Sequence, residues 1–387
     1  MDSLTIDNEQ FILYKKLDDS DINLKNTDVK VTVHAKDPSI KITLKGKSID
    51  HSVSNAIRLA ILMYIPVFNF HRSKLQVEKK ESGYSNSYNN DRIETIVENC
   101  PIYNIEFDEY LLNPDIHLPP DVNKTIFSNF TQEKYENITD LDNNRTKNTP
   151  PGPQSEKMGT KGTEGTQDRE SEIKIPKIIM ALTKINTDPL KTIFATTHDC
   201  KLTVNGKNSD EYKKHDRIDL FLLHPGESIS FIVEAVLGIS LMYGIHNSTT
   251  VVVSKEISEN HYELLYDTLG QIASIDIFRK ACSILIRKLE LLNEFIASNY
   301  RNQVETNQYV EIQIKGENHM LGNTLSTTLK KSRDIREASY VMPHSLDNLI
   351  IIKYKLNDDS KIKDPIDAIL HVIEYLIKIY GSILDQI

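Results

Sequence analysis

The sequence lacks the features that mark secreted, membrane-spanning or disulfide-stabilised proteins. It has 387 residues, no tryptophan and only three cysteines, Cys100, Cys200 and Cys282, which lie far apart and outside any C-x-x-C pair. A disulfide framework and a zinc ribbon both need more, and more closely spaced, cysteines. The longest nearly uninterrupted apolar stretch, residues 59–68, contains a proline and is far shorter than the roughly 20 residues that cross a bilayer. We therefore expect no membrane-spanning helix and a reducing compartment.

The N-terminal residues also lack the pattern of a signal peptide. Residues 1–9 contain neither a basic nor an apolar segment, so secretion is not expected. The charge is moderately acidic, with 55 Asp and Glu against 46 Lys and Arg and a net charge of -9. This balance argues against a basic nucleic-acid-binding surface over most of the protein.

Residue patterns that would indicate catalysis are missing as well. A two-metal site needs closely grouped carboxylates, and the acidic clusters at 18–21 and 358–359 lie in a predicted tail and a predicted loop. Neither of the common glycine-rich phosphate-binding motifs occurs. The segment 198–200 reads His-Asp-Cys, but neighbouring positions on a strand point to opposite faces, which argues against a nucleophile and its base. We predict no catalytic residue, no metal and no cofactor.

What the sequence does contain is a clear order of strands and helices. After an acidic tail at 1–27, which we expect to be flexible, residues 28–45 alternate between apolar and polar side chains and predict a β-hairpin. Apolar side chains spaced by three and four over 53–64 predict an amphipathic helix. Residues 71–215 are then predicted to form a β-rich inserted domain. Within it, 142–172 is rich in proline and glycine and is expected to be a mobile loop.

The same order of elements occurs twice, which predicts an α+β fold with two related modules. The first module is assigned to 28–70 and 216–300, and it ends in a helix whose apolar residues over 278–296 recur at alternate steps of four and three. The second, 301–387, has a strand, a helix, two strands and a last helix with the same stepping over 366–384. Either the two apolar stripes pack on each other in a shared core, or each helix covers its own sheet. The spacing alone does not separate these interpretations.

Four short segments resemble a known family. Residues 54–62 read SNAIRLAIL and residues 223–229 read LHPGESI. Both are similar to motifs of the α-like assembly subunits of cellular RNA polymerases, which include bacterial alpha, archaeal D and the eukaryotic third-largest subunit. Residues 317–325 read ENHMLGNTL and residues 340–346 read YVMPHSL. This pair resembles the signature of the smaller partner, archaeal L or the eukaryotic eleventh subunit.

The resemblance implies two alpha-subunit-like dimerisation modules that pack as a pseudo-dimer, with the β-rich domain inserted in the first. In the family the partners are usually separate chains, and their union in one chain resembles the fused assembly subunit of large cytoplasmic DNA viruses. Asn55 and Arg58 are the implied contacts to a large subunit, although Leu59 replaces an arginine of the family motif. The expected interface between the modules consists of apolar helix residues and one glycine: Ile57, Ile61, Leu285, Leu289, Leu292, Leu321, Gly322, Leu325, Ile373 and Ile377.

The implied function is that of a non-catalytic assembly platform. It would dock the largest and second-largest subunits of a DNA-directed RNA polymerase, together with a small assembly subunit, and would meet DNA only through that complex. We expect no homodimer and no membrane contact, and a location in the host cytoplasm or the virion. The residues by themselves leave two other classes open, an α+β adaptor of another complex and a divergent enzyme that uses the inserted domain.

Overall fold

The computed structural model describes residues 27–36, 38–78, 88–105, 176–241, 244–300, 309–344, 349–360, 362 and 364–387. These residues form two compact units. The first unit contains 27–67, 101–105 and the residues from 237 onward, and the second contains 68–100 and 176–236. The predicted mobile loop at 142–172 and the predicted tail, apart from Thr27, lie outside the described residues.

The first unit begins with the predicted hairpin. Strand β1 (Lys30–Lys36) pairs antiparallel with β2 (Ser39–Lys45), with Val31 opposite Leu44, which confirms that prediction. Two later strands, β10 (Val253–Ser258) and β11 (His261–Asp267), complete a sheet in the order β1-β2-β11-β10. The alternation of side chains buries one face of β2, so the sheet needs helices to cover that face.

Helices α1 (His51–Met63) and α5 (Ser274–Tyr300) contact this sheet. The Asp50 carboxylate begins α1 by accepting a hydrogen bond from the amide of Val53 at 2.9 Å, which satisfies one of the free amides of the first turn. The α1 helix ends at Met63 with Tyr64 as its C-terminal cap, two residues before Pro66.

A second sheet in the same unit has the order β12-β14-β13. Its strands are β12 (Val310–Lys315), β13 (Ile335–Val341) and β14 (Leu349–Leu356). Helix α6 (His319–Lys331) packs on β13 and β14 and is capped by Asn318, which accepts from the Met320 amide at 3.0 Å. Helix α7 (Pro365–Leu384) follows, with Asp364 as its cap and Pro365 in the first turn, where a missing amide hydrogen costs nothing.

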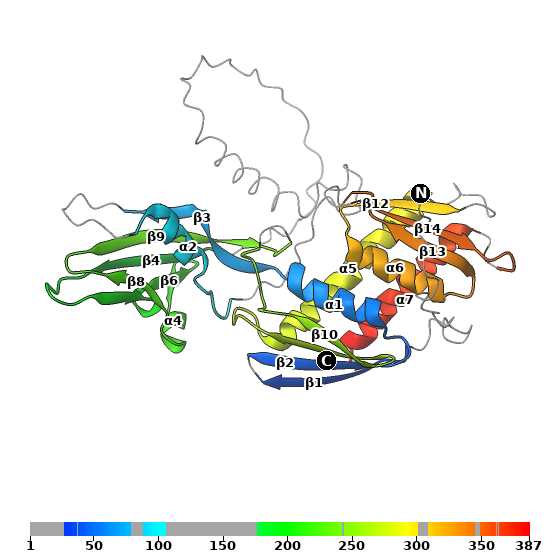
Figure 1. Cartoon of the computed structure of the whole chain (residues 1–387), viewed down its shortest axis with the longest axis horizontal. Helices are drawn as coiled ribbons and strands as arrows, with labels where there is room; N and C mark the ends of the chain where they lie inside the picture. The colour runs from blue at the N-terminus through cyan, green and yellow to red at the C-terminus, as the bar shows by residue number, and fades with distance from the viewer. Residues whose placement is uncertain are drawn as a thin grey trace, which may run out of the picture. The chain divides into compact units, whose positions relative to one another are not determined.

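The four helices share one core. Helix α5 packs along α7, α1 packs against α5 and α6, and α6 also contacts α7. In Figure 1 the four helices, α1 in blue, α5 in yellow, α6 in orange and α7 in red, lie together in a layer between the two sheets. The long helices α5 and α7 therefore pack on each other, and α5 also contacts β2.

The second unit is β-rich. Its larger sheet has the order β3-β9-β4-β6-β7, and β5 pairs with β8. The strands are β3 (Val67–Val77), β4 (Ile178–Ile185), β5 (Ile193–Thr196), β6 (Lys201–Val204), β7 (Lys207–Ser209), β8 (Asp219–Leu223) and β9 (Ser228–Gly238). Three short helical segments accompany them, α2 (Asn90–Glu98), η3 (Thr197–Asp199) and α4 (Glu211–Lys214).

The second unit extends to residue 236, beyond the boundary predicted at residue 215. Strand β8 pairs with β5, and β9 pairs with β4 from Ser228 to Glu234. Residues 216–236 therefore belong to the second unit and not to the first module. The error arose because alternation along a strand identifies its buried face but not the strand it pairs with.

Candidate functional site: the helix core and the outer face of α1

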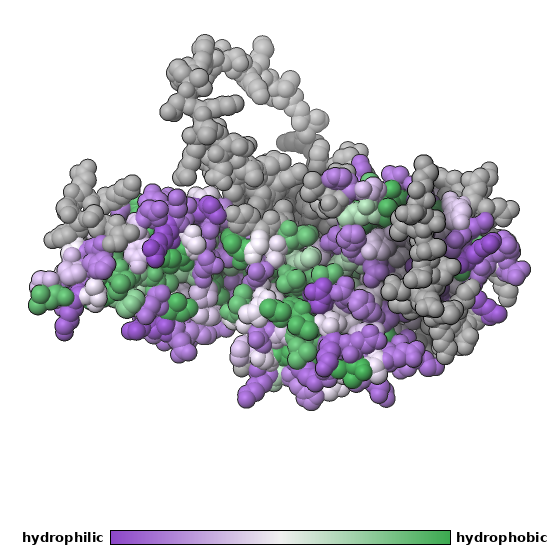
Figure 2. Space-filling model, in the orientation of Figure 1, coloured by the Kyte–Doolittle hydropathy of each residue, from purple (hydrophilic) through white to green (hydrophobic). Residues whose placement is uncertain are grey.

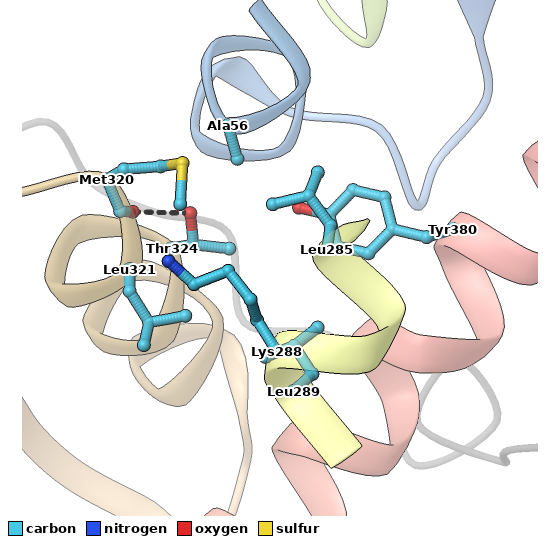
Figure 3. Close-up of a pocket in the computed structure, with 8 residues that line it drawn as sticks. All are labelled: Ala56, Leu285, Lys288, Leu289, Met320, Leu321, Thr324 and Tyr380. Atoms are coloured by element: carbon cyan, nitrogen blue, oxygen red, sulfur yellow. Dashed lines mark hydrogen bonds between the residues drawn. The ribbon is translucent and has the colours of Figure 1, made fainter. Parts of the chain in front are cut away.

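The helix core of the first unit contains most of the residues predicted for the interface between modules. Leu285 and Leu289 of α5 and Leu321 of α6 line a small cavity where α1, α5, α6 and α7 meet. Figure 3 shows side chains from all four helices directed toward this centre. The predicted residues that are no more than 3% exposed are Ile57, Ile61, Leu285, Leu289, Leu292, Leu321, Leu325 and Ile373.

Two predicted interface residues have different surroundings. Ile377 is only half-buried, because the buried face of α7 passes through Leu376, Ile379 and Tyr380 instead. Gly322 was expected to allow close approach of helices from the two modules. A Cβ atom at this position would instead lie 2.5 Å from the Tyr340 ring of β13, so the reason for glycine is a contact within the second module.

A buried ion pair that no sequence pattern predicted lies next to this cavity. The Lys288 ammonium of α5 lies 2.8 Å from a Glu317 carboxylate oxygen, and the two side chains are 1% and 0% exposed. The same ammonium lies 4.0 Å from the centroid of the Tyr64 ring, above its face. Burial by itself lowers the pKa of Lys288, but the Glu317 carboxylate and the Tyr64 side chain outweigh it, so the pKa is raised and the ammonium stays charged.

A second ion pair joins the start of α1 to the end of α6. Lys331 pairs with Asp50, and both side chains are about 15% exposed. Burial by itself raises the pKa of Asp50, whereas the Lys331 charge and hydrogen bonds from Lys331, Ser52 and Val53 lower it, and the net pKa lies below its ordinary value. The Asp50 carboxylate therefore caps α1 and pairs with α6 at the same time.

The Lys288–Glu317 pair has a weak signal in the sequence. Lys288 directly precedes Leu289 of the predicted apolar stripe, and Glu317 opens the ENHMLGNTL segment. A charged residue beside an apolar stripe is usually a solvated edge position. Only the proximity of residues that are distant in the chain reveals the pairing.

The outer face of α1 carries the two predicted contacts to a large subunit. The Arg58 guanidinium donates to the Asn55 side-chain oxygen at 2.9 Å, and both residues are half-buried. Leu59, Leu62 and Met63 are also half-buried. Figure 2 shows apolar surface, in green, in the region where Figure 1 places α1 and β10, bordered by polar surface in purple. This face combines one held cation with apolar side chains, as protein-binding surfaces often do.

The cysteines do not provide reactive groups. All three are buried, and burial raises the pKa of Cys200 to about 12 and that of Cys100 and Cys282 further. Such thiols stay protonated at neutral pH and are poor nucleophiles. Within the part of the chain that the structure describes, no group of His, Cys, Asp and Glu could hold a metal ion, and no helix is long and apolar enough to cross a bilayer.

Comparisons with known proteins identify the family. A protein of Acanthamoeba polyphaga mimivirus, named as a DNA-directed RNA polymerase subunit, is 34% identical over 360 residues, which cover 93% of either chain. The chain belongs to this family of RNA polymerase subunits. Residues 309–386 of the polymerase subunit match the RNA polymerase Rpb3/Rpb11 dimerisation domain, and this match contains α6, α7 and the second sheet.

Archaeal relatives match about a fifth of this polymerase subunit. Subunit Rpo11 of Saccharolobus shibatae is 40% identical over 79 residues, 20% of this chain and 83% of the archaeal one. Subunit Rpo11 of Metallosphaera sedula is 34% identical over 83 residues, 21% of this chain and 89% of its own. These findings confirm the predicted relationship to α-like RNA polymerase subunits and the prediction of a non-catalytic assembly subunit.

Proposed function

We propose that the first unit is a pseudo-dimer that forms the platform on which the large polymerase subunits assemble. The observation that carries this proposal is the single core formed by α1, α5, α6 and α7. In this proposal, residues 28–67 and 237–300 form a first dimerisation module and residues 301–387 form the second. The second unit is then a domain inserted in the first module, within 68–236.

Further contacts in the first unit support a rigid pairing of the modules. The Thr324 hydroxyl of α6 lies 3.4 Å from the Ser52 carbonyl oxygen of α1, and the Tyr375 hydroxyl of α7 donates to the Ser48 hydroxyl at 3.1 Å. The Gln386 side chain accepts from the Val31 amide of β1 at 3.1 Å. Because both modules lie in one chain, their pairing is intramolecular, at an effective concentration of millimolar order.

We propose the outer face of α1 as the docking surface for a large subunit. The hydrogen bond from Arg58 to Asn55 holds the guanidinium beside half-buried Leu59 and Leu62. An anchored arginine next to apolar side chains provides a charged contact without a large loss of side-chain entropy on binding. The partners would be the largest and second-largest subunits and a small assembly subunit, with DNA reached only through the complex. The mimivirus relative supports a location in the host cytoplasm or the virion.

Co-purification from infected cells tests this proposal. A tagged full chain should bring down both large subunits, and Arg58→Glu should reduce their recovery at least about tenfold, because a charge reversal at a docking contact costs 1.4 kcal/mol or more. The matched control is Lys45→Glu, which reverses a charge at an exposed position of β2 and should leave recovery unchanged. A tagged chain that purifies without polymerase subunits would support an adaptor of another complex instead.

A further inference from the structure

The helices of the two parts of the first unit can be aligned position by position, which makes their differences informative. The Tyr266 hydroxyl of β11 donates to the carbonyl oxygen of Ser274, the first residue of α5, at 2.7 Å. The Tyr354 hydroxyl of β14 donates to the carbonyl oxygen of Pro365, the first residue of α7, at 2.8 Å. Counted from these equivalent starts, every position of α5 that is buried up to Leu292 is also buried in α7. Lys288 of α5 then corresponds to Ile379 of α7.

The shorter helices correspond in the same way. Helices α1 and α6 each have 13 residues and begin at a side-chain cap, Asp50 in α1 and Asn318 in α6. The residues directly before the caps are Ile49 and Glu317, and both are 0% exposed. Glu317 in the second half of the unit therefore corresponds to Ile49 in the first half.

These correspondences show that the buried charges lie on one side only. Lys288 of the first half meets Glu317 of the second half in an ion pair. At the equivalent place, Ile379 of the second half lines a cavity with Ser48 and Asp50, the residues on either side of Ile49. At one end of the pairing this position holds a fully buried ion pair. At the other end it holds two isoleucines, and the partly exposed Asp50–Lys331 pair lines the same cavity.

The ends of α1 and α6 show an asymmetry of the opposite sense, with the ion pair at the Ile379 end. The cap of α1, Asp50, pairs with the Lys331 ammonium at the end of α6. The cap of α6, Asn318, instead donates a neutral hydrogen bond of 3.3 Å to the Tyr64 hydroxyl at the end of α1. Two independent contacts therefore distinguish the first half from the second half across the core.

We propose that the Lys288–Glu317 ion pair makes the first half pair with the second half and prevents pairing of like halves. This inference rests on the proposed pseudo-dimer. If two first halves paired, each Lys288 would face the apolar Ile49 position. If two second halves paired, each Glu317 would face the apolar Ile379 position. Either arrangement separates Lys288 and Glu317 from each other, and the nearest opposite charges would then be Asp50 or Lys331 at a partly exposed helix end. Loss of the fully buried pair is unfavourable.

A role in selectivity also accounts for the presence of an ion pair in an apolar core. Replacing a buried ion pair with apolar residues is often neutral or stabilising, so a buried pair is weak evidence for added stability. Polar groups at buried helix positions are better attested as devices that select the pairing partner. The Lys288 and Glu317 side chains, at 1% and 0% exposure, have the burial that such a device requires.

Charge reversal between full-length chains tests this inference. One chain carries Lys288→Glu and another carries Glu317→Lys, so that like charges meet within each chain. When the two are co-expressed with different tags, the first half of each chain can pair with the second half of the other. We expect them to co-purify as a 1:1 dimer, at a level at least about tenfold above that of wild type co-expressed with the Lys288→Glu chain. Co-purification no higher than in that control would overturn the inference, even if both chains are poorly folded alone.

A second variant tests the same inference without introducing like charges. Lys288→Ile with Glu317→Ile makes the ionic end resemble its apolar counterpart. After refolding of a concentrated solution, this chain should form dimers with cross-links between two copies of α5, whereas wild type should be monomeric. The matched control is Ile49→Leu with Ile379→Leu, which changes the apolar end conservatively and should stay monomeric. A double isoleucine variant as monomeric as wild type would contradict the inference. Both experiments are done without other polymerase subunits, so their outcome is separate from that of the docking test.

Discussion

Removing one partner of the Lys288–Glu317 ion pair should destabilise the first unit far more than removing both. In Glu317→Leu, the Lys288 ammonium stays in a site that is 1% exposed, with the ring of Tyr64 at 4.0 Å as a weak substitute for the carboxylate. Truncation of one partner of a buried pair costs about 3 to 5 kcal/mol. In Lys288→Leu with Glu317→Leu, neither charge remains, and the unfolding free energy should be within about 1 kcal/mol of wild type or higher.

Native-state hydrogen exchange is the appropriate assay for this pair of variants. The chain has two units, so a single melting curve does not report the first unit alone. Amides in the middle of α5 and α6 report its opening free energy directly. A loss below about 1 kcal/mol in Glu317→Leu, or a double variant as unstable as the sum of both single variants, would refute the reasoning.

The pH dependence of the unfolding free energy provides a second readout, and its sign should differ between wild type and Glu317→Leu. In wild type the folded-state pKa of Lys288 is raised above its ordinary value of 10.5. The pair's contribution is therefore fully present below pH 10.5 and is lost as the pH rises through the folded-state pKa. In Glu317→Leu, burial without the carboxylate lowers the Lys288 pKa. Its unfolded state then binds more protons, so the stability of that variant should increase as the pH rises from 7 toward 10.

Three further predictions concern other contacts of the first unit. Gly322→Ala places a Cβ 2.5 Å from the Tyr340 ring and should lower the opening free energy of the first unit by about 1 to 3 kcal/mol in native-state hydrogen exchange. The loss should be smaller when Tyr340→Leu is also present. Because the pKa of Asp50 is lowered, its carboxylate contributes stability that is fully present above the ordinary value of 3.8 and is lost as the pH falls through the lower folded-state value. Asp50→Asn should therefore show a smaller loss of first-unit stability than wild type between pH 5 and pH 3 in native-state hydrogen exchange. Leu321→Asp with Leu325→Asp buries two carboxylates in the helix core and should abolish co-purification of the large polymerase subunits; recovery of intact complexes would count against the platform.

The local elements could be predicted because their signals lie within a few residues of each other. Alternation predicted the hairpin of β1 and β2, and the spacing of apolar residues predicted α1 and the long helices. The motif at 317–325 identified the family, because its order of residues is specific without any knowledge of the fold.

The sequence did not predict which strands pair with each other or which residues of a helix face its neighbours. Residues 216–236 were assigned to the first module because their strands alternate, yet their pairing with β5 and β4 places them in the second unit. Stepping by four and three suggested Ile377 for the core, whereas the buried face of α7 passes through Ile379. Periodicity determines that a helix has an apolar face, but the neighbouring helices determine how wide that face is.

The sequence by itself determined the order of strands and helices, the absence of catalytic motifs and the family, because each depends on residues near one another in the chain. Only the tertiary structure decided that Lys288 meets Glu317 and that Asp50 meets Lys331. The value of a charge depends on its burial and on the partner within a few ångströms, and both arise only when distant segments pack together.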